Sequence, residues 1–334
     1  MFIYPFYALF FQDTGLSLTQ ITYLFIIWYA AAIITAIPSG ILADKISRKV
    51  VVILGQLVKL VGFSVWLVSP TFWGFALGLA LWGIGISTKY GALEALVYDE
   101  LSSLKRSKEF VKINGRVESI ASSAVFIAAI IAASLIEHGY EFVHVLSIVS
   151  AVVALGGILY LPNVRPRNTV SKNYIQASKD AITAVTSNKK VLLLAVIAVT
   201  TIAIFQTFDE YSSLIFSEIG LELSQISIAE AFVGLAAVVG SAQAHRLSKY
   251  SMRTHVIVTL VSGAIALTGL MLGVISAVVG IVIYTTLIIA VAVSSESQLQ
   301  EHFDQDKRAA MLSVVGICMD LLGVASFLVL STVL

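Results

Sequence analysis

Long apolar segments separated by short polar ones recur along the chain. A helix needs roughly 20 residues to cross a bilayer core of about 30 Å, and ten segments are close to that length. They lie at 19–43, 50–69, 73–98, 115–136, 142–161, 191–214, 224–244, 254–272, 276–299 and 309–333. The first eleven residues are also apolar, but as a helix they would reach only about 16 Å. The pattern predicts an all-α polytopic membrane protein with ten full spans and one partial span.

The composition supports lipid as the solvent and excludes several classes of function. The 334 residues are 58% hydrophobic and 12% charged, whereas soluble domains carry roughly 25% charged residues. A net charge of +1 gives no indication of nucleic-acid binding, and a single cysteine, Cys318, excludes an intramolecular disulfide. The sequence contains neither a nucleotide-binding phosphate loop nor a His-Glu-x-x-His zinc motif. We therefore expect no enzymatic activity, no metal site and no cofactor.

Basic residues alternate between the connections of the predicted spans. Nineteen of the 21 Lys and Arg residues lie in the segments 45–49, 105–116, 165–190, 246–253 and 307–308. The intervening connections contain no basic residue and carry acidic ones instead. Short basic loops stay in the cytoplasm. The pattern predicts a multi-pass protein of the plasma or bacterial inner membrane, with the basic loops and the central linker cytoplasmic.

The chain also repeats itself. "TGLSLTQI" (14–21) matches "IGLELSQI" (219–226), and "ADKISRK" (43–49) matches "AHRLSKY" (244–250). Each match lies in the second helix of its half, and internal repeats of this kind are typical of secondary transporters. The predicted domains are an N-terminal bundle (1–162), a cytoplasmic linker (163–190) and a C-terminal bundle (191–334).

Three segments resemble motifs of the major facilitator superfamily. "GILADKISRK" (40–49) follows the second span and is similar to the family's Gly-x-Leu-Ala-Asp-Arg-x-Gly-Arg-Arg/Lys loop, with Ser47 in place of the second glycine. "YGALEALVYDEL" (90–101) resembles a stretch of one prokaryotic branch, and "RAAMLS" (308–313) resembles the start of the eleventh helix. The glycine- and proline-rich fifth-helix motif of many drug/proton antiporters is absent from 119–135.

This resemblance implies two pseudo-symmetric six-helix bundles, of which the chain holds about eleven of twelve helices. It further implies that the sequence is truncated at both ends. The function implied is secondary active transport of a small solute by rocker-switch alternating access, coupled to protons and performed by a monomer in the lipid bilayer. The sequence leaves open the solute, the direction of transport and the coupling ion. A non-transporting protein of the same fold, such as a sensor or a truncated pseudo-transporter, is the alternative.

The resemblance also assigns a conformational latch to the charged loop at 40–49. In the family, the carboxylate at the position of Asp44 meets the positive end of the eleventh helix and holds the two halves together on the cytoplasmic side. The expected latch residues are Gly40, Asp44, Lys45, Arg48, Lys49, Asp99 and Arg308. In the second half His245 occupies the position of Asp44, so an equivalent latch is altered or absent there.

Charged side chains inside the predicted spans form a second set of candidates, because such charges are costly in lipid. The candidates for contact with substrate or protons are Asp209, Glu210, Asp320, Lys89, Glu94, Gln206, Tyr4 and Tyr7. Most have a plainer alternative: acids at a helix end, a structural Lys–Glu pair or ordinary lipid-facing aromatics. Asp320 lies midway through the eleventh span and has no partner that the sequence indicates. For Lys59, in the third span, we favour a structural role.

Overall fold

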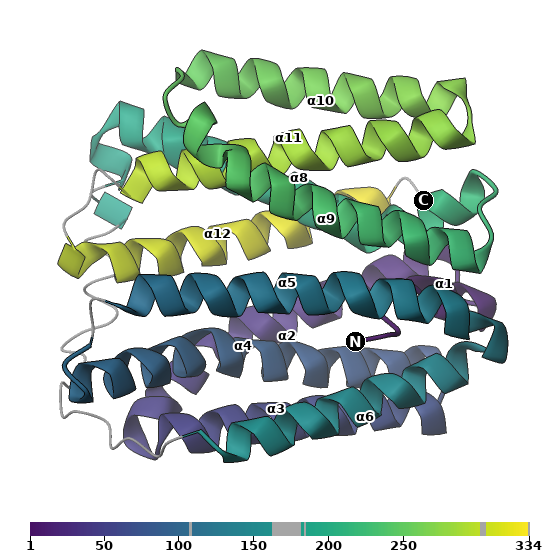
Figure 1. Cartoon of the computed structure of the whole chain (residues 1–334), viewed down its shortest axis with the longest axis horizontal. Coiled ribbons are helices and arrows are strands. Elements are labelled where there is room, and N and C mark those ends of the chain that lie inside the picture. Colours follow the sequence, from purple (N-terminus) through teal and green to yellow (C-terminus); the bar gives the residue numbers. More distant parts are fainter. Residues whose placement is uncertain (107–108, 162–181, 184, 301–304, 333–334) are drawn as a thin grey trace. The chain divides into compact units, whose positions relative to one another are not determined.

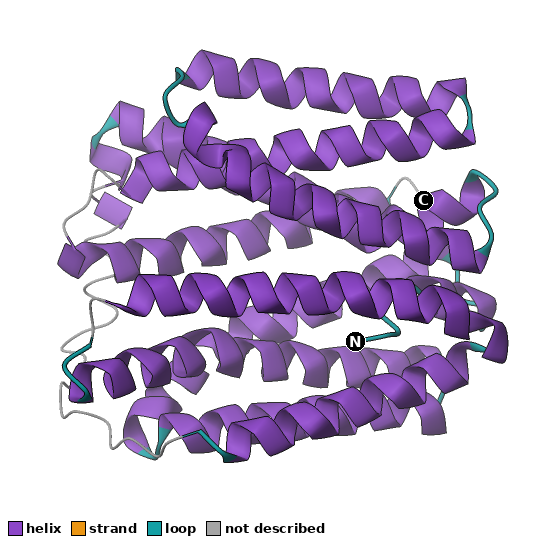
Figure 2. Cartoon of the chain, in the orientation of Figure 1, coloured by secondary structure: helices purple, strands orange, loops and turns teal. Residues whose placement is uncertain are grey.

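The structure is a computed structural model that describes all residues except 107–108, 162–181, 184, 301–304 and 333–334 (Figure 1). The described residues form helices and short connections without strands (Figure 2). The helices are α1 (Tyr7–Asp13), α2 (Leu18–Lys45), α3 (Arg48–Val68), α4 (Phe72–Ser103), α5 (Phe110–Leu135), η2 (Ile136–His138), α6 (Tyr140–Leu159), α8 (Lys189–Glu218), α9 (Leu223–Leu247), α10 (Met252–Leu272), α11 (Val274–Gln300) and α12 (Gln305–Ser331).

The predicted all-α membrane architecture is confirmed. Each of the ten predicted spans coincides with a helix to within a few residues. Seven of the described helices are long and apolar enough to cross a bilayer, and α4, α5 and α12 contain shorter apolar stretches. The predicted partial span is the seven-residue helix α1. The segment before it is fixed by the Ile3 backbone N–H, which donates to Ser147 Oγ on α6 at 2.8 Å.

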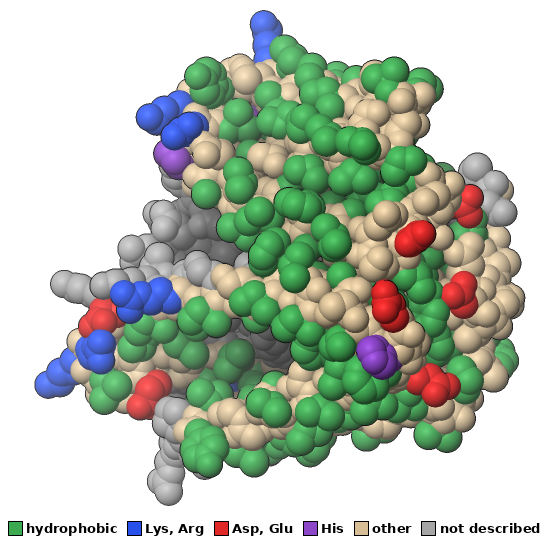
Figure 3. Space-filling view, turned by 45° about the vertical axis from the view of Figure 1, so that its right-hand side comes forward, with side chains coloured by type: hydrophobic (Ala, Val, Ile, Leu, Met, Phe, Trp, Pro, Cys, Tyr) green, Lys and Arg blue, Asp and Glu red, His purple; other side chains and the backbone are tan. Residues whose placement is uncertain are grey.

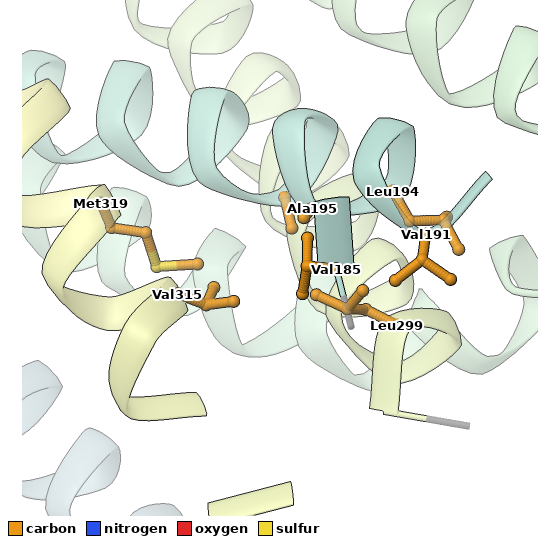
Figure 4. Close-up of a cluster of buried hydrophobic side chains, with 8 residues drawn as sticks. Val185, Val191, Leu194, Ala195, Leu299, Val315 and Met319 are labelled. Atoms are coloured by element: carbon orange, nitrogen blue, oxygen red, sulfur yellow. The ribbon is translucent and has the colours of Figure 1, made fainter. Parts of the chain in front are cut away.

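The chain divides into two compact units. One comprises Met1–Val170 with Phe327–Leu334, and the other comprises Ser171–Ser326. The predicted linker, 163–190, lies mostly outside the described residues, so its boundaries stay predictions. In the second unit, Val185 packs with Leu194, Leu299 and Met319 in a buried hydrophobic cluster (Figure 4).

The internal repeat is visible at the level of single turns. Gly15 and Gly220 both have φ of +92°, a conformation that only glycine adopts without strain. Each turn leads into a helix that begins with a capping box: the backbone N–H of Ser17 donates to Gln20 Oε1 at 2.9 Å, and that of Glu222 donates to Gln225 Oε1 at 3.0 Å. The matching letters at 14–21 and 219–226 therefore encode the same local structure.

Glycines allow neighbouring helices to approach closely at corresponding places in the two units. A Cβ atom on Gly78 of α4 would lie 2.6 Å from the carbonyl oxygen of Gly62 on α3. Likewise, a Cβ atom on Gly269 of α10 would lie 2.4 Å from the carbonyl oxygen of Ser276 on α11. Small residues at helix interfaces are a common means of packing in membranes. The third and fourth helices of each half are thus held backbone to backbone.

Large hydrophobic side chains remain exposed along the helices. Val153 is 70% exposed, Leu260 is 68% exposed and Ile34 is 71% exposed. Figure 3 shows hydrophobic side chains along the length of the helices, with charged side chains gathered near helix ends. Contiguous apolar surface of this extent matches a hydrocarbon surrounding rather than water.

Candidate functional site

A cluster of carboxyl groups lies between α8 and α9 in the second unit. Asp209 and Glu210 are adjacent on α8, and Glu230 lies on α9. Ser212 Oγ lies 2.5 Å from Glu230 Oε1 and so joins the two helices. Glu210 is only 4% exposed. Since α8 ends at Glu218, Glu210 lies about 12 Å along the helix from that end.

The hydrogen bonds around Ser212 have a consequence for the proton on Glu230. Ser212 Oγ also lies 2.8 Å from the backbone carbonyl oxygen of Asp209, yet a serine hydroxyl has one proton to donate. If the carboxyl of Glu230 carries a proton, it donates to Ser212 Oγ, and Ser212 then donates to the carbonyl of Asp209. If Glu230 is ionised, the hydroxyl of Ser212 must donate to Glu230, and the backbone carbonyl of Asp209 then loses its hydrogen bond from Ser212. The protonated form satisfies both short contacts.

Two further acceptors lie on the same face of α8. Gln206 and Glu210 are four residues apart, so their side chains are neighbours one helical turn apart. Gln206 Oε1 and Glu210 Oε2 are both buried and have no hydrogen-bond partner among the described residues. Oxygen atoms without partners in a buried site are costly. This face of α8 can therefore receive a proton, an organic cation or a ligand with hydroxyl or amine donors.

Helix packing fixes this face of α8. Asn188 caps the helix, accepting from the backbone N–H of Lys190 at 3.0 Å. At the level of the cluster, Phe208 packs edge-to-face on Tyr284 of α11, with ring centroids 5.3 Å apart. Tyr284 itself is buried. The contact of Phe208 with α11 and that of Ser212 with α9 thus hold α8 between two neighbouring helices at the level of the carboxyl groups.

In the first unit, the predicted tyrosines lie in or beside an aromatic cluster. Tyr7 is 4% exposed and packs on Trp66 and Trp82 at centroid distances of 6.4 and 5.9 Å. Tyr4 lies beside it at 5.9 Å. The ammonium of Lys59 sits 5.7 Å from the ring centroid of Trp82, within the range of a cation–π interaction. This contact supports a structural role for Lys59.

The latch residues are described only in part. The side chains of Asp44, Lys45, Asp99 and Arg308 lie outside the described side chains, and so does the surrounding of Gly40. Lys49 has partners that the sequence did not indicate: its Nζ donates to the carbonyls of Leu159 at 2.7 Å and Leu161 at 2.6 Å, at the end of α6. Cations are favoured at helix C-termini. The latch as a whole stays a prediction.

No described contact links the other predicted charged residues to the carboxyl cluster. Asp320 is partly buried on α12, and its carboxyl has no hydrogen bond or ion pair within the described part of the chain. The side chains of Lys89 and Glu94, on α4, lie outside the described ones. Among the described residues, no group of three or more His, Cys, Asp or Glu is arranged to hold a metal ion.

Sequence reasoning missed Glu230 and Ser212. The signal for Glu230 was present, because it is the single acid within the 25 residues of α9. A lone carboxylate in an apolar span is a functional candidate by default. Ser212 carried no such signal, since serine is common in membrane helices and its role depends on the register between α8 and α9.

Comparison with known proteins identifies the family of this chain. The family model for the Major Facilitator Superfamily matches residues 1–327. An uncharacterized transporter of Buchnera aphidicola subsp. Schizaphis graminum (strain Sg) is 28% identical over 150 residues, which are 44% of this chain and 36% of that protein. The alignment thus spans about a third of the relative's length.

Solved structures share the fold at low sequence identity. A variant of the nucleoside transporter NupG gives a TM-score of 0.81 at 14% identity, covering 99% of this chain and 87% of that one. The D-xylose–proton symporter gives 0.74 at 12% identity, covering 95% and 81%. A bacterial homolog of the human lysosomal transporter Spinster gives 0.75 at 14% identity, covering 96% and 76%. With the family model matching almost its whole length, this chain belongs to the major facilitator superfamily of membrane transporters.

Proposed function

We propose that this membrane transporter moves a small solute by alternating access and couples that movement to protons through the carboxyl groups of Glu230 and Glu210. The observation that carries the proposal is the 2.5 Å contact between Ser212 Oγ and Glu230 Oε1. It joins two helices through a group that can exchange a proton with its surroundings. A change in the surroundings of this pair between the two open states would therefore change the affinity for the proton, which is the requirement for coupling.

Glu210 and Gln206 support the same proposal from the neighbouring face. Both present a buried oxygen without a partner among the described residues. A solute with hydroxyl or amine donors would satisfy these atoms, whereas an anion would add acceptors where donors are needed. We therefore propose a neutral or cationic solute rich in hydrogen-bond donors.

Alternating access is proposed from the repeat. The two halves begin their second helices with the same turn and the same capping box. Structurally repeated halves are the parts that rock against each other in secondary transporters. The proposed orientation keeps the basic loops in the cytoplasm.

The experiment has two stages. Untargeted metabolite profiles of cells that lack or overproduce the protein identify the solute. Purified protein is then reconstituted into liposomes, and accumulation of that solute is measured with and without an imposed proton gradient. We expect Glu230→Gln and Glu210→Gln each to lower gradient-driven accumulation by at least about tenfold, equivalent to about 1.4 kcal/mol.

The matched control is Glu218→Gln, an exposed carboxyl at the end of the same helix, which we expect to accumulate solute like the wild type. Solute exchange without a gradient separates coupling from folding, since a folded but uncoupled variant still exchanges solute. Full accumulation by Glu230→Gln would contradict the coupling role. Absence of any solute movement by folded wild-type protein would favour the non-transporting alternative.

A further inference from the structure

A second site lies in the same unit, at the end where α8 and α10 begin. The cavity there has a volume of about 790 Å³ and is bounded by α8, the α9–α10 connection, α10 and α11. Its polar wall includes Lys190, Tyr250, Ser251 and Arg253. Gln298 of α11 closes one side by donating to the backbone carbonyl of Ser248 at 2.6 Å. The carboxyl cluster contributes no residue to this cavity.

The residues that line the cavity include two basic side chains and no acidic one. The side chains of Lys190 and Arg253 are exposed and line it from two different helices. Within the described ranges, neither one forms an ion pair or a side-chain hydrogen bond. The segment from Ala244 to His255 contains no acidic residue, so it adds no negative charge. Two cations facing one cavity favour an anionic occupant.

The backbone adds donors to the same wall. The side chain of Ser251 does not cap α10, although Ser251 is the residue at the N-cap position. The next two backbone N–H groups, of Met252 and Arg253, have no acceptor among the described residues. Both residues line the cavity. Free N–H groups beside basic side chains suit the oxygen atoms of a phosphate group.

Exposed apolar side chains lie along α8 and α10 beyond the residues that line the cavity. Leu193 lines the cavity and is 46% exposed. Further along α8, Val196 is 50% exposed, and on α10 Ile257 and Leu260 are 58% and 68% exposed. An acyl chain can lie along these side chains while its headgroup occupies the polar wall. A free anion in water would make no use of these side chains.

We propose that this cavity binds the phosphate headgroup of an acidic phospholipid from the leaflet on the side of the basic loops. Basic pockets between membrane helices are suited to such headgroups. Because the cavity is built wholly from the second unit, a bound lipid would bridge α8, α10 and α11. The proposal is independent of the transported solute and of proton coupling.

The test measures lipid retention on the whole purified protein. Protein in detergent is delipidated, titrated with short-chain phosphatidylglycerol or phosphatidylcholine, and analysed by native mass spectrometry. We expect selective binding of phosphatidylglycerol, weakened about fivefold by Lys190→Gln or Arg253→Gln, since a basic residue near an anionic lipid contributes a factor of this size. Arg253→Lys keeps the charge and is expected to retain most of the binding.

The matched control is Lys249→Gln, which removes an exposed basic residue of the same connection that does not line the cavity. Its affinity should stay within about twofold of the wild type. Equal binding of the two lipids, or equal losses in Lys249→Gln and Arg253→Gln, would overturn the proposal. A third arm uses inorganic phosphate alone: saturable phosphate binding without selective lipid retention would overturn the assignment to a lipid. Unchanged thermal unfolding in phosphatidylcholine confirms that each variant is folded.

Discussion

Ser212 on α8 and Glu230 on α9 share a hydrogen bond of 2.5 Å, which is short for two oxygen atoms. This contact joins α8 to α9 through a carboxyl group. It also makes the α8–α9 interface sensitive to the protonation of one carboxyl group. The contact therefore links helix packing and proton binding within a single unit.

The first prediction concerns the proton on Glu230. We expect infrared spectra of the wild-type protein at neutral pH to contain a C=O stretch of protonated carboxyl groups that shifts in heavy water. Glu230→Gln should remove part of that band, because the substitution keeps the shape and hydrogen-bonding capacity of the side chain without a titratable proton. Glu218→Gln, at the exposed end of α8, should leave the band unchanged. An identical band in wild type and Glu230→Gln would contradict the proposed protonation.

The second prediction concerns close helix packing in the first unit. Gly78→Ala places a Cβ atom 2.1 Å from Trp66 Nε1 and 2.6 Å from the Gly62 carbonyl oxygen. Backbone and a buried indole cannot yield cheaply, so we expect a loss of about 1–3 kcal/mol in the free energy of unfolding. Thermal unfolding in detergent, followed by tryptophan fluorescence, measures the change.

The control for this substitution is Gly156→Ala in α6, where an added Cβ would meet nothing within 4 Å. Alanine favours helix there, so the control should be neutral or stabilising by up to about 1 kcal/mol. If both variants unfold at the same temperature as the wild type, the α3–α4 glycine contact does not contribute to stability.

The sequence predicted the helices and the repeat well because local residue patterns determine both. Runs of apolar residues determine where a helix can span the bilayer, and Gly15 and Gly220 mark two turns with the same φ of +92°. The candidate site was predicted only by half. Asp209 and Glu210 are adjacent in sequence and visible as charges, whereas their association with Glu230 depends on how α8 and α9 are rotated against each other.

The partners of Lys49 could not be predicted for the same reason, because they too depend on how distant helices pack. The family resemblance placed it among the latch residues, and its contacts with the carbonyls of Leu159 and Leu161 come from a helix more than a hundred residues away. Such long-range carbonyl contacts leave no pattern in the sequence. Side-chain chemistry can therefore nominate a residue, while its partners require the packed structure.

The third prediction tests the latch. Asp44→Asn keeps the size of the side chain but removes the charge that the resemblance assigns to the end of the eleventh helix, here α12. We expect solute transport at equal expression to fall at least about tenfold, with a much smaller effect on folding, because the charge biases an equilibrium between open states. His245→Asn is the matched control at the repeat position in α9, where His245 is exposed. Unchanged transport by Asp44→Asn would remove the latch from the mechanism.

The fourth prediction tests the orientation in the membrane. Ser69 follows α3, and Ser103 is the last residue of α4. Since α4 begins at Phe72 and has 32 residues, its length of about 48 Å is sufficient to separate the two sites across the hydrocarbon core.

Cys318 is exposed and must first be replaced by serine to give a background without thiols. A cysteine at position 69 should then react with a membrane-impermeant maleimide added outside intact cells. A cysteine at position 103 should react only after the membrane is opened. The neighbouring segment 105–116 carries five basic residues, and basic residues of this kind hold a loop in the cytoplasm. Labelling of both positions from the same side would contradict the topology, and with it the cytoplasmic placement of the charged loop at 40–49.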